Sequence, residues 1–188
     1  MADKTQKRLA PDERKAALLS TAIALLARNG LEEFSLEAVA REAGVALSLP
    51  RHYFGGYRDL LKAATENLLK EVEQTLLSQE VTLDLRSRVS SYMDLLATNP
   101  WGHQVWMRSA SIHPDVDAIV RQARRRMAEA MYRKSWQSLS LQEQFDARGR
   151  IGYVEAVISD WLEAGSTDRE LVAELVVRII SLYEKKQG

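Results

Sequence analysis

The chain has 188 residues, with 26 basic and 26 acidic side chains, no cysteine and 46% hydrophobic residues. The absence of cysteine excludes disulfides, thiolate metal sites and cysteine nucleophiles. A formal net charge of zero argues against a protein that coats nucleic acid by bulk charge, although a local basic face is still possible. Apolar residues recur at helical intervals, without repeats or an alternating strand pattern, which predicts an all-α protein.

The N-terminal segment 1–9 carries Lys4, Lys7 and Arg8 and is expected to be a flexible basic arm, either contacting DNA or simply solvated. A first helix is predicted from Pro11 to Asn29, because proline suits the first helical position. The apolar stretch 16–27 is too short to span a bilayer. We therefore expect a cytoplasmic protein that does not enter a membrane.

The stretch from Ser35 to Leu60 predicts a helix, a tight turn and a second helix. Ser35 is a typical N-cap residue, and Gly44 can adopt the left-handed conformation that ends the first helix. The second helix spans 46–54, and its regular part is expected to begin near Ser48, so that Pro50 lies in the first turn. A short turn between two helices is typical of a unit whose second helix enters the DNA major groove.

Further helices are expected over about 57–78, 83–98 and 101–110, and from His113-Pro114 to about Leu139. The last two helices should begin at two capping boxes, Ser140–Glu143 and Thr167–Glu170. Within the long helix, Arg124, Arg125 and Arg126 point in successive directions. We interpret them as a solvated face rather than one patch.

Several short motifs occur in a characteristic order: Asn29-Gly30, Phe34-Ser35, Ala43-Gly44-Val45, His52-Tyr53-Phe54 and Asp59-Leu60-Leu61. This order resembles the N-terminal DNA-binding domain of the TetR family of transcriptional regulators. The motifs cover roughly residues 10–65, and helix count and spacing extend the likeness more loosely to the end of the chain. The resemblance implies an all-α homodimer that binds an operator and is usually released by a small molecule.

With this resemblance, the expected fold is an N-terminal three-helix, helix-turn-helix DNA-binding domain followed by a larger helical ligand-binding and dimerisation domain, with about nine helices in all. The predicted ranges are 1–9 for the arm, 10–56 for the DNA-binding domain and 57–188 for the larger domain. The long helix from Tyr57 is expected to be the lever between ligand and DNA.

The predicted contacts with double-stranded DNA come from the helix-turn-helix geometry and from the resemblance. They are Ser35, Leu47, Ser48, Arg51, His52, Tyr53 and Tyr57. His52 and Tyr53 have the alternative role of packing against the next helix. Three positions depart from the family pattern. Ala46 replaces a capping serine or threonine, Pro50 interrupts the recognition helix, and Tyr57 stands where a phosphate-binding lysine is common.

The middle of the chain is rich in large, adaptable side chains, which can line an apolar pocket with a few polar groups. The resemblance places the regulator's ligand pocket here, and the apolar and aromatic character of the residues favours a small hydrophobic or aromatic inducer. The candidates are Tyr92, Met93, Trp101, His103, Trp106, Met107, Met127 and Met131. The alternative is that these residues form an ordinary core.

The last two helices are apolar over more than one stripe, which indicates a second face to bury. The resemblance identifies it as the interface of a homodimer, with the alternative of a hairpin buried within one protomer. The predicted interface residues are Ile151, Val154, Ile158, Trp161, Leu175, Val176, Ile179 and Tyr183.

Catalysis is not expected, because no nucleophile motif or glycine-rich phosphate loop is present. The three histidines have no helix-face pair at ligand spacing, so neither a metal nor a cofactor is expected. The sequence favours a ligand-responsive DNA-binding regulator, most simply a repressor. Two alternatives stay open: a helical ligand-binding or protein-interaction module with weak or lost DNA binding, and a small helical enzyme.

Overall fold

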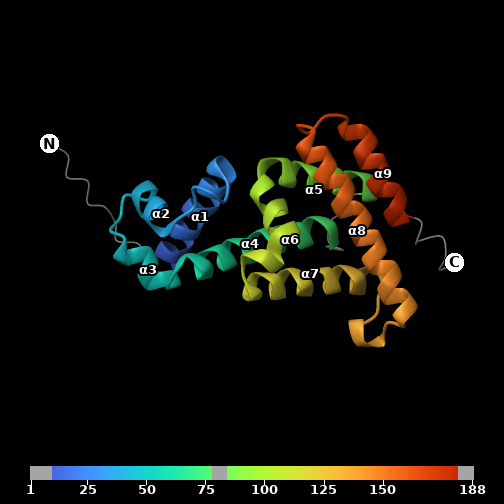
Figure 1. Cartoon of the computed structure of the whole chain (residues 1–188), viewed down its shortest axis with the longest axis horizontal. Helices are drawn as coiled ribbons and strands as arrows, with labels where there is room; N and C mark the ends of the chain where they lie inside the picture. The colour runs from blue at the N-terminus through green and yellow to red at the C-terminus, as the bar shows by residue number, and fades with distance from the viewer. Residues whose placement is uncertain (1–9, 78–83, 182–188) are drawn as a thin grey trace. The chain divides into compact units, whose positions relative to one another are not determined.

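The computed structural model describes residues 10–77 and 84–181, and all regular structure in these ranges is helical (Figure 1). This confirms the predicted all-α class. The described helices are α1 (Pro11–Asn29), α2 (Leu36–Glu42), α3 (Ser48–Phe54), α4 (Tyr57–Leu77), α5 (Leu85–Thr98), α6 (Pro100–Ile112), α7 (Pro114–Tyr132), the short 3-10 helix η1 (Trp136–Ser138), α8 (Leu141–Glu163) and α9 (Arg169–Ser181).

The chain divides into two compact units, Met1–Ala64 and Thr65–Gly188. The division falls inside α4 rather than at its first residue, so this helix contributes residues to both units. The predicted domain ranges 1–9, 10–56 and 57–188 stay predictions. The predicted basic arm lies outside the described residues, as do Leu182, Tyr183, Lys185 and Lys186 at the end of the chain.

In the N-terminal unit, α1, α2 and α3 pack against one another around a small apolar core. Leu26 and Val39 are fully buried there, and Phe34, in the connection between α1 and α2, is buried as well. At the surface, Arg28 Nη2 of α1 lies 3.0 Å from Glu42 Oε1 of α2. The core thus positions α2 and α3 relative to α1.

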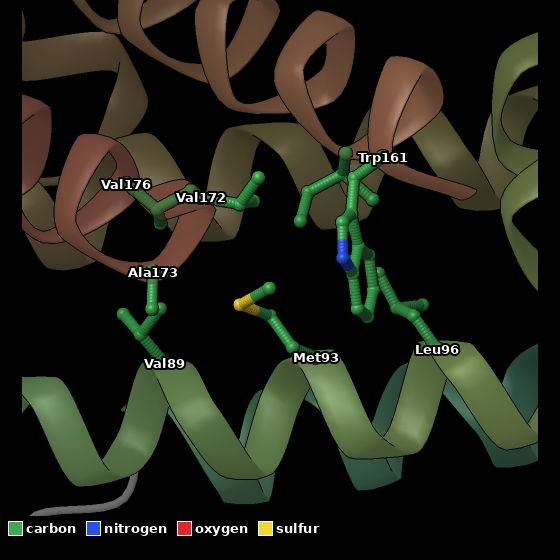
Figure 2. Packing of buried hydrophobic residues seen from close by; sticks show 8 residues of the cluster. Val89, Met93, Leu96, Trp161, Val172, Ala173 and Val176 are labelled. Carbon is green, nitrogen blue, oxygen red and sulfur yellow. The ribbon is translucent and has the colours of Figure 1, made fainter. Parts of the chain in front are cut away.

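The C-terminal unit has a core between α5, α8 and α9 (Figure 2). Val89, Met93 and Leu96 extend from α5 toward Trp161 of α8 and the apolar side of α9 (Figure 2). Met93 is fully buried. A second cluster joins Ala128 and Tyr132 of α7 to Leu139 and to Ala147 of α8.

Most helix boundaries agree with the sequence, but α5 and α6 differ by a few residues. Helix α5 begins at Leu85, not Leu83, because the Asp84 carboxylate accepts a hydrogen bond from Ser87 N–H at 3.0 Å and caps the helix. Pro100 lies between the helices expected over 83–98 and 101–110. In the structure it occupies the first position of α6, where its missing N–H costs nothing.

The prediction that one helix continues to Leu139 is wrong. Helix α7 ends at Tyr132, and Arg133 adopts a left-handed conformation with φ of 52°. The Glu129 carboxylate accepts the backbone N–H of Trp136 at 2.7 Å, which stabilises the turn into η1. Leu139 then returns to the core.

The two predicted capping boxes have opposite outcomes. Ser140 caps α8 as expected, with its Oγ 3.2 Å from Glu143 N–H and its own N–H 2.7 Å from Glu143 Oε2. The Thr167 box is wrong, because α9 begins only at Arg169. The hydroxyl of Thr167 instead donates to the carbonyl of Ala164 in the turn that closes α8.

Candidate nucleic-acid interface and effector site

The turn between α2 and α3 is built as the sequence predicts. Ser35 Oγ accepts a hydrogen bond from Ala38 N–H at 3.0 Å and caps α2. Gly44 has a φ of 65°, a conformation in which a side chain would be strained. Val45 N–H donates to the Ala40 carbonyl at 3.0 Å, so the chain turns sharply before α3.

Helix α3 begins at Ser48, as expected from the position of Pro50. Pro50 is the third helical residue and is buried, so its ring helps fill the core while its missing N–H falls in the first turn. Because Pro50 has no N–H to donate, the Ala46 carbonyl instead accepts the N–H of Leu49 at 2.9 Å. Leu47 stands at the N-cap without a side-chain hydrogen bond, so the start of α3 is uncapped.

The side chains of α3 separate into an inner and an outer face. Pro50 and Phe54 are buried, whereas Ser48, Arg51 and His52 are exposed. The exposed residues have helical spacing and therefore form one continuous polar stripe. Of the predicted DNA contacts, these three are available to a ligand in the surrounding solvent, while Leu47 and Tyr53 are half-buried.

Two weak contacts hold the exposed stripe. Arg51 Nη2 lies 4.0 Å from Glu37 Oε1 of α2, and both side chains are about 60% exposed to solvent, at 62% and 61%. The rings of His52 and Tyr53 meet edge to face, with centroids 5.2 Å apart. An ion pair this exposed contributes little to stability, so the guanidinium can exchange Glu37 for a phosphate or a guanine at small cost.

Tyr57 lies at the start of α4, and the residue is 37% exposed. Its ring meets buried Phe34, with centroids 5.5 Å apart. Partial burial raises the pKa of the Tyr57 hydroxyl, so it stays protonated and can donate a hydrogen bond. Sequence reasoning overlooked its neighbour Arg58, which is exposed in the same turn. A basic residue next to Tyr57 was the signal that could have identified it.

Ser35 differs from the other predicted DNA contacts. Its hydroxyl is engaged as the cap of α2 and its side chain is half-buried. Its role in the described structure is to cap and position α2. Its influence on the position of α3 is indirect, through the turn that joins α2 to α3.

The residues predicted to line the inducer pocket do not all lie together. Tyr92 and Met93 pack with the α5–α8–α9 core, Met131 packs on the cluster between α7 and α8, and Met107 is 47% exposed. Met127 is half-buried. The apolar set is therefore distributed between separate contacts.

A polar subset of these residues does come together between α6, α7 and α8. His103 is 8% exposed, and its Nε2 lies 2.6 Å from Ser159 Oγ of α8. Trp106 Nε1–H donates to Glu155 Oε1 at 2.5 Å. Trp101, in the first turn of α6, is almost fully buried. The partners Glu155 and Ser159 were absent from the sequence prediction, because only the packing of α8 against α6 makes them neighbours.

The arginine run on α7 has partners on different sides of the helix. Arg124 Nε lies 2.8 Å from Glu155 Oε1, Arg126 Nη2 lies 2.5 Å from Glu73 Oε1 of α4, and Arg125 lies over the Trp136 ring. The expectation that they point in separate directions is confirmed. The expectation of a merely solvated face is wrong, because Arg124 pairs with an acidic residue of α8 and Arg126 pairs with an acidic residue of α4.

The predicted dimer residues divide by burial. Ile151, Ile158, Trp161 and Val176 are buried within the described protomer, while Val154, Leu175 and Ile179 are half-buried. Tyr183 lies outside the described residues. Sequence reasoning missed the apolar residues that α8 and α9 expose, which are Leu141, Phe145, Tyr153 and Leu171.

Within residues 10–77 and 84–181, no group of three or more His, Asp or Glu side chains is arranged to hold a metal ion. None of the helices described has both the length and the apolar character needed to cross a membrane.

Comparison with known proteins gives a family match for the helix-turn-helix unit and more distant matches over nearly the whole chain. A family described as "Bacterial regulatory proteins, tetR family" matches residues 18–64. The HTH-type transcriptional regulator BetI of Vibrio parahaemolyticus is 23% identical over 188 residues, covering 94% of this chain and 93% of that protein. BetI of Brucella anthropi is 36% identical over 63 residues, or 34% of this chain and 32% of that protein.

Solved structures share the fold over nearly the whole chain. A tetR-family transcriptional regulator from Streptomyces coelicolor superposes with a TM-score of 0.75 at 20% identity, covering 93% of this chain and 80% of that one. The multidrug binding protein EbrR, complexed with imidazole, gives a TM-score of 0.66 at 16% identity, covering 88% of this chain and 94% of that one. The helix-turn-helix unit thus belongs to the tetR family of bacterial regulatory proteins over residues 18–64, and the chain shares the fold of TetR-like transcriptional regulators over nearly its whole length.

Proposed function

We propose that this regulator is a cytoplasmic repressor that binds a near-palindromic operator as a homodimer and is released by a small molecule. The observation that carries the proposal is the exposed stripe Ser48, Arg51 and His52 on the second helix of a helix-turn-helix. Polar and basic side chains on such a helix can reach base edges and phosphates when it enters the major groove.

The individual roles follow from chemistry and exposure. Arg51 contacts a guanine or a phosphate, and Ser48 contacts a base edge or a phosphate. His52, Tyr53 and Tyr57 donate hydrogen bonds to phosphates. Leu47 touches a thymine methyl group.

A dimer of such units reads two half-sites about 34 Å apart, or a multiple of the helical turn. The operator should therefore be an inverted repeat. Because phosphate contacts release counterions, binding should weaken as salt rises.

Dimerisation is supported by an apolar stripe that α8 exposes. Leu141 is 64%, Phe145 57% and Tyr153 40% exposed, and they recur at intervals of four and eight residues on one face. The same face includes Gly149, where an added Cβ would meet no atom within 4 Å, so another helix can approach closely. We infer that this stripe and exposed Leu171 of α9, rather than buried Val176, contact the partner.

Release by a ligand requires a ligand that prefers one arrangement of the DNA-binding units over the other. Helix α4 is continuous from Tyr57 to Leu77 and contributes to both units, which supports its role as the lever. The aromatic residues Trp101, Trp106 and Tyr92 of the C-terminal unit support an inducer that has hydrophobic or aromatic parts.

The test is selection of bound sequences from a random duplex library at near-physiological salt. An inverted repeat with turn-matched spacing is expected for the wild-type chain and should be lost for Arg51→Ala. Arg108→Ala, at an exposed arginine on α6, is the matched control and should select the same repeat. If the folded wild type enriches no sequence, the proposal fails, and a module that has lost DNA binding becomes the better description.

A further inference from the structure

Three helices of the C-terminal unit bring an aromatic ring, a carboxylate and a guanidinium together. Trp106 of α6 donates its indole N–H to Glu155 Oε1 of α8 at 2.5 Å. Arg124 of α7 donates from Nε to the same oxygen at 2.8 Å. The Arg124 guanidinium carbon also lies 4.8 Å from the centre of the Trp106 ring. The guanidinium thus has a π face on one side and a carboxylate on another.

The two charges of this pair are not equally withdrawn from water. The Glu155 side chain is 17% exposed and that of Arg124 is 32% exposed. The Glu155 carboxylate accepts a hydrogen bond from the indole N–H of Trp106, which is uncharged and remains protonated. The guanidinium is at the end of a long, flexible side chain at the outer edge of the contact. Arg124 is therefore the component that can move away at lower cost.

The charge of Glu155 also acts on two buried groups of the same unit, Tyr92 and His103. Burial raises the pKa of the Tyr92 hydroxyl, and the charge of Glu155 raises it further. Burial lowers the pKa of His103, while Glu155 and Glu163 both act in the opposite direction. His103 therefore favours its neutral form, and its contact with Ser159 needs no charge. If Arg124 swings outward, a half-buried carboxylate that is hydrogen-bonded to the Trp106 indole is left without its cation.

We propose that Trp106 and Glu155 form a binding site for an organic cation, and that Arg124 is a competitor for this site built into the protein. The inference rests on the proposed function, since it names the chemical class of the inducer. A cation with an apolar surface replaces the guanidinium on the Trp106 ring and on the carboxylate, and gains both cation–π and ionic attraction. An anion would instead meet Glu155 at close range. A neutral ligand would leave the carboxylate without a counter-charge.

The position of the site on α6 gives it a connection to the lever helix. Gly102 precedes Trp106 by about one turn, and a Cβ at Gly102 would lie only 2.0 Å from Leu68 Cδ2 of α4. The Leu68 side chain of α4 therefore packs directly against the backbone of α6 at this point. A ligand that separates Arg124 from Glu155 loosens the contact between α7 and α8 beside Trp106, which lies on the same face of α6 as Gly102. The displacement of α6 is then transmitted to α4.

The binding experiment is calorimetric titration of the full chain with phenyltrimethylammonium, whose charge does not depend on pH. Its neutral isostere tert-butylbenzene and the anion benzoate are the comparison ligands. Arg124→Gln removes the competitor and should bind the cation about tenfold more tightly than the wild type. Glu155→Gln and Trp106→Leu should each bind it at least about tenfold more weakly.

Two further variants control for changes in folding. Arg126→Gln breaks an ion pair of similar exposure on the same helix, with Glu73 of α4, and should bind the cation as the wild type does. The double variant Arg124→Gln/Glu155→Gln has lost both charges and should lose the gain seen for Arg124→Gln alone. Equal binding of the neutral isostere, or an Arg124→Gln variant no tighter than the wild type, overturns the proposal.

A second readout separates this inference from the proposed function. Release of the selected operator is measured with and without the cation. Operator binding without any cation binding overturns the ligand class and leaves the regulator intact. Cation binding with the expected variant pattern, in a chain that selects no operator, supports the site and overturns the proposed function.

Discussion

The recognition surface on α3 and the polar contact between α6, α7 and α8 use the same chemistry in opposite ways. On α3, Arg51 and Glu37 are 4.0 Å apart with side chains 62% and 61% exposed. Between α7 and α8, Arg124 and Glu155 are 2.8 Å apart with side chains 32% and 17% exposed. The first pair is in water and is easily exchanged for another partner. The second is partly desolvated, so removing one partner affects the fold or creates a demand for another charge.

The largest expected loss of stability comes from placing a charge in the apolar core of the C-terminal unit. Val176 is 1% exposed in the α5–α8–α9 core, so Val176→Asp should reduce the free energy of unfolding by about 3–5 kcal/mol. Chemical denaturation measures this loss. Leu171→Asp, on the exposed side of the same helix, should leave the protomer folded and weaken its dimer in sedimentation instead. If Val176→Asp dissociates the dimer without loss of stability, the assignment of Val176 to the core is wrong.

Breaking the half-buried pair should come next. Arg124→Ala leaves the Glu155 carboxylate partly buried without its cation, and we expect a loss of about 1–3 kcal/mol in unfolding free energy. Arg51→Ala should change the same quantity by less than about 0.5 kcal/mol, because both members of its pair are exposed. Equal losses in urea denaturation would remove the distinction between the two pairs.

The exposed pair should matter for binding rather than for folding. Arg51→Ala is expected to weaken binding of the selected operator by about 1–3 kcal/mol. Fluorescence anisotropy with a labelled duplex measures the change, and a circular dichroism melt checks that the fold persists. An unchanged affinity would remove Arg51 from the DNA-binding surface.

A smaller effect is expected at the cap that positions α2. Ser35→Ala removes the hydrogen bond to Ala38 N–H and should destabilise the N-terminal unit by about 1 kcal/mol. Hydrogen exchange of the α2 amides would detect the loss. Ser35→Asp keeps an acceptor at the cap and should retain most of the protection. If alanine and aspartate behave alike, the hydroxyl does not act as a cap.

The smallest expected effect is a change in stability with pH, which comes from the titration of Glu143 at the start of α8. The hydrogen bond from Lys134, together with the N–H and hydroxyl of Ser140, lowers the pKa of Glu143 to about 2. A depressed pKa contributes stability above the ordinary value of the carboxyl group, and this contribution is lost as the pH falls toward about 2. Side-chain NMR should show Glu143 titrating near pH 2, and Lys134→Ala should raise that midpoint. A midpoint near 4.5 in the wild type would contradict the capping contact.

The local signals of the N-terminal unit could be read almost residue by residue. Ser35, Gly44 and Pro50 each restrict the backbone within a few residues of themselves, so the cap, the turn and the late start of α3 were predictable. The Thr167 box failed for a related reason. Its hydroxyl has a second local acceptor, the carbonyl of Ala164, and the sequence does not say which one it uses.

The contacts of the C-terminal unit were less predictable, because they join residues far apart in the chain. Glu155 was overlooked although Trp106 was a candidate, and Val176 was assigned to a dimer interface although it belongs to the protomer core. Helical periodicity shows that a face is apolar, but it does not show whether the same chain or a second copy covers that face.

By itself the sequence determined the helical class, the helix-turn-helix and the polar stripe of α3, because caps, turns and helical spacing act over a few residues. Only the tertiary structure decided that Arg124 pairs with Glu155, that α6 packs on α4 at Gly102, and that Leu141, Phe145 and Tyr153 stay exposed. Those facts depend on which helix faces meet, and burial by distant parts of the chain is a property of the packed fold rather than of any local pattern.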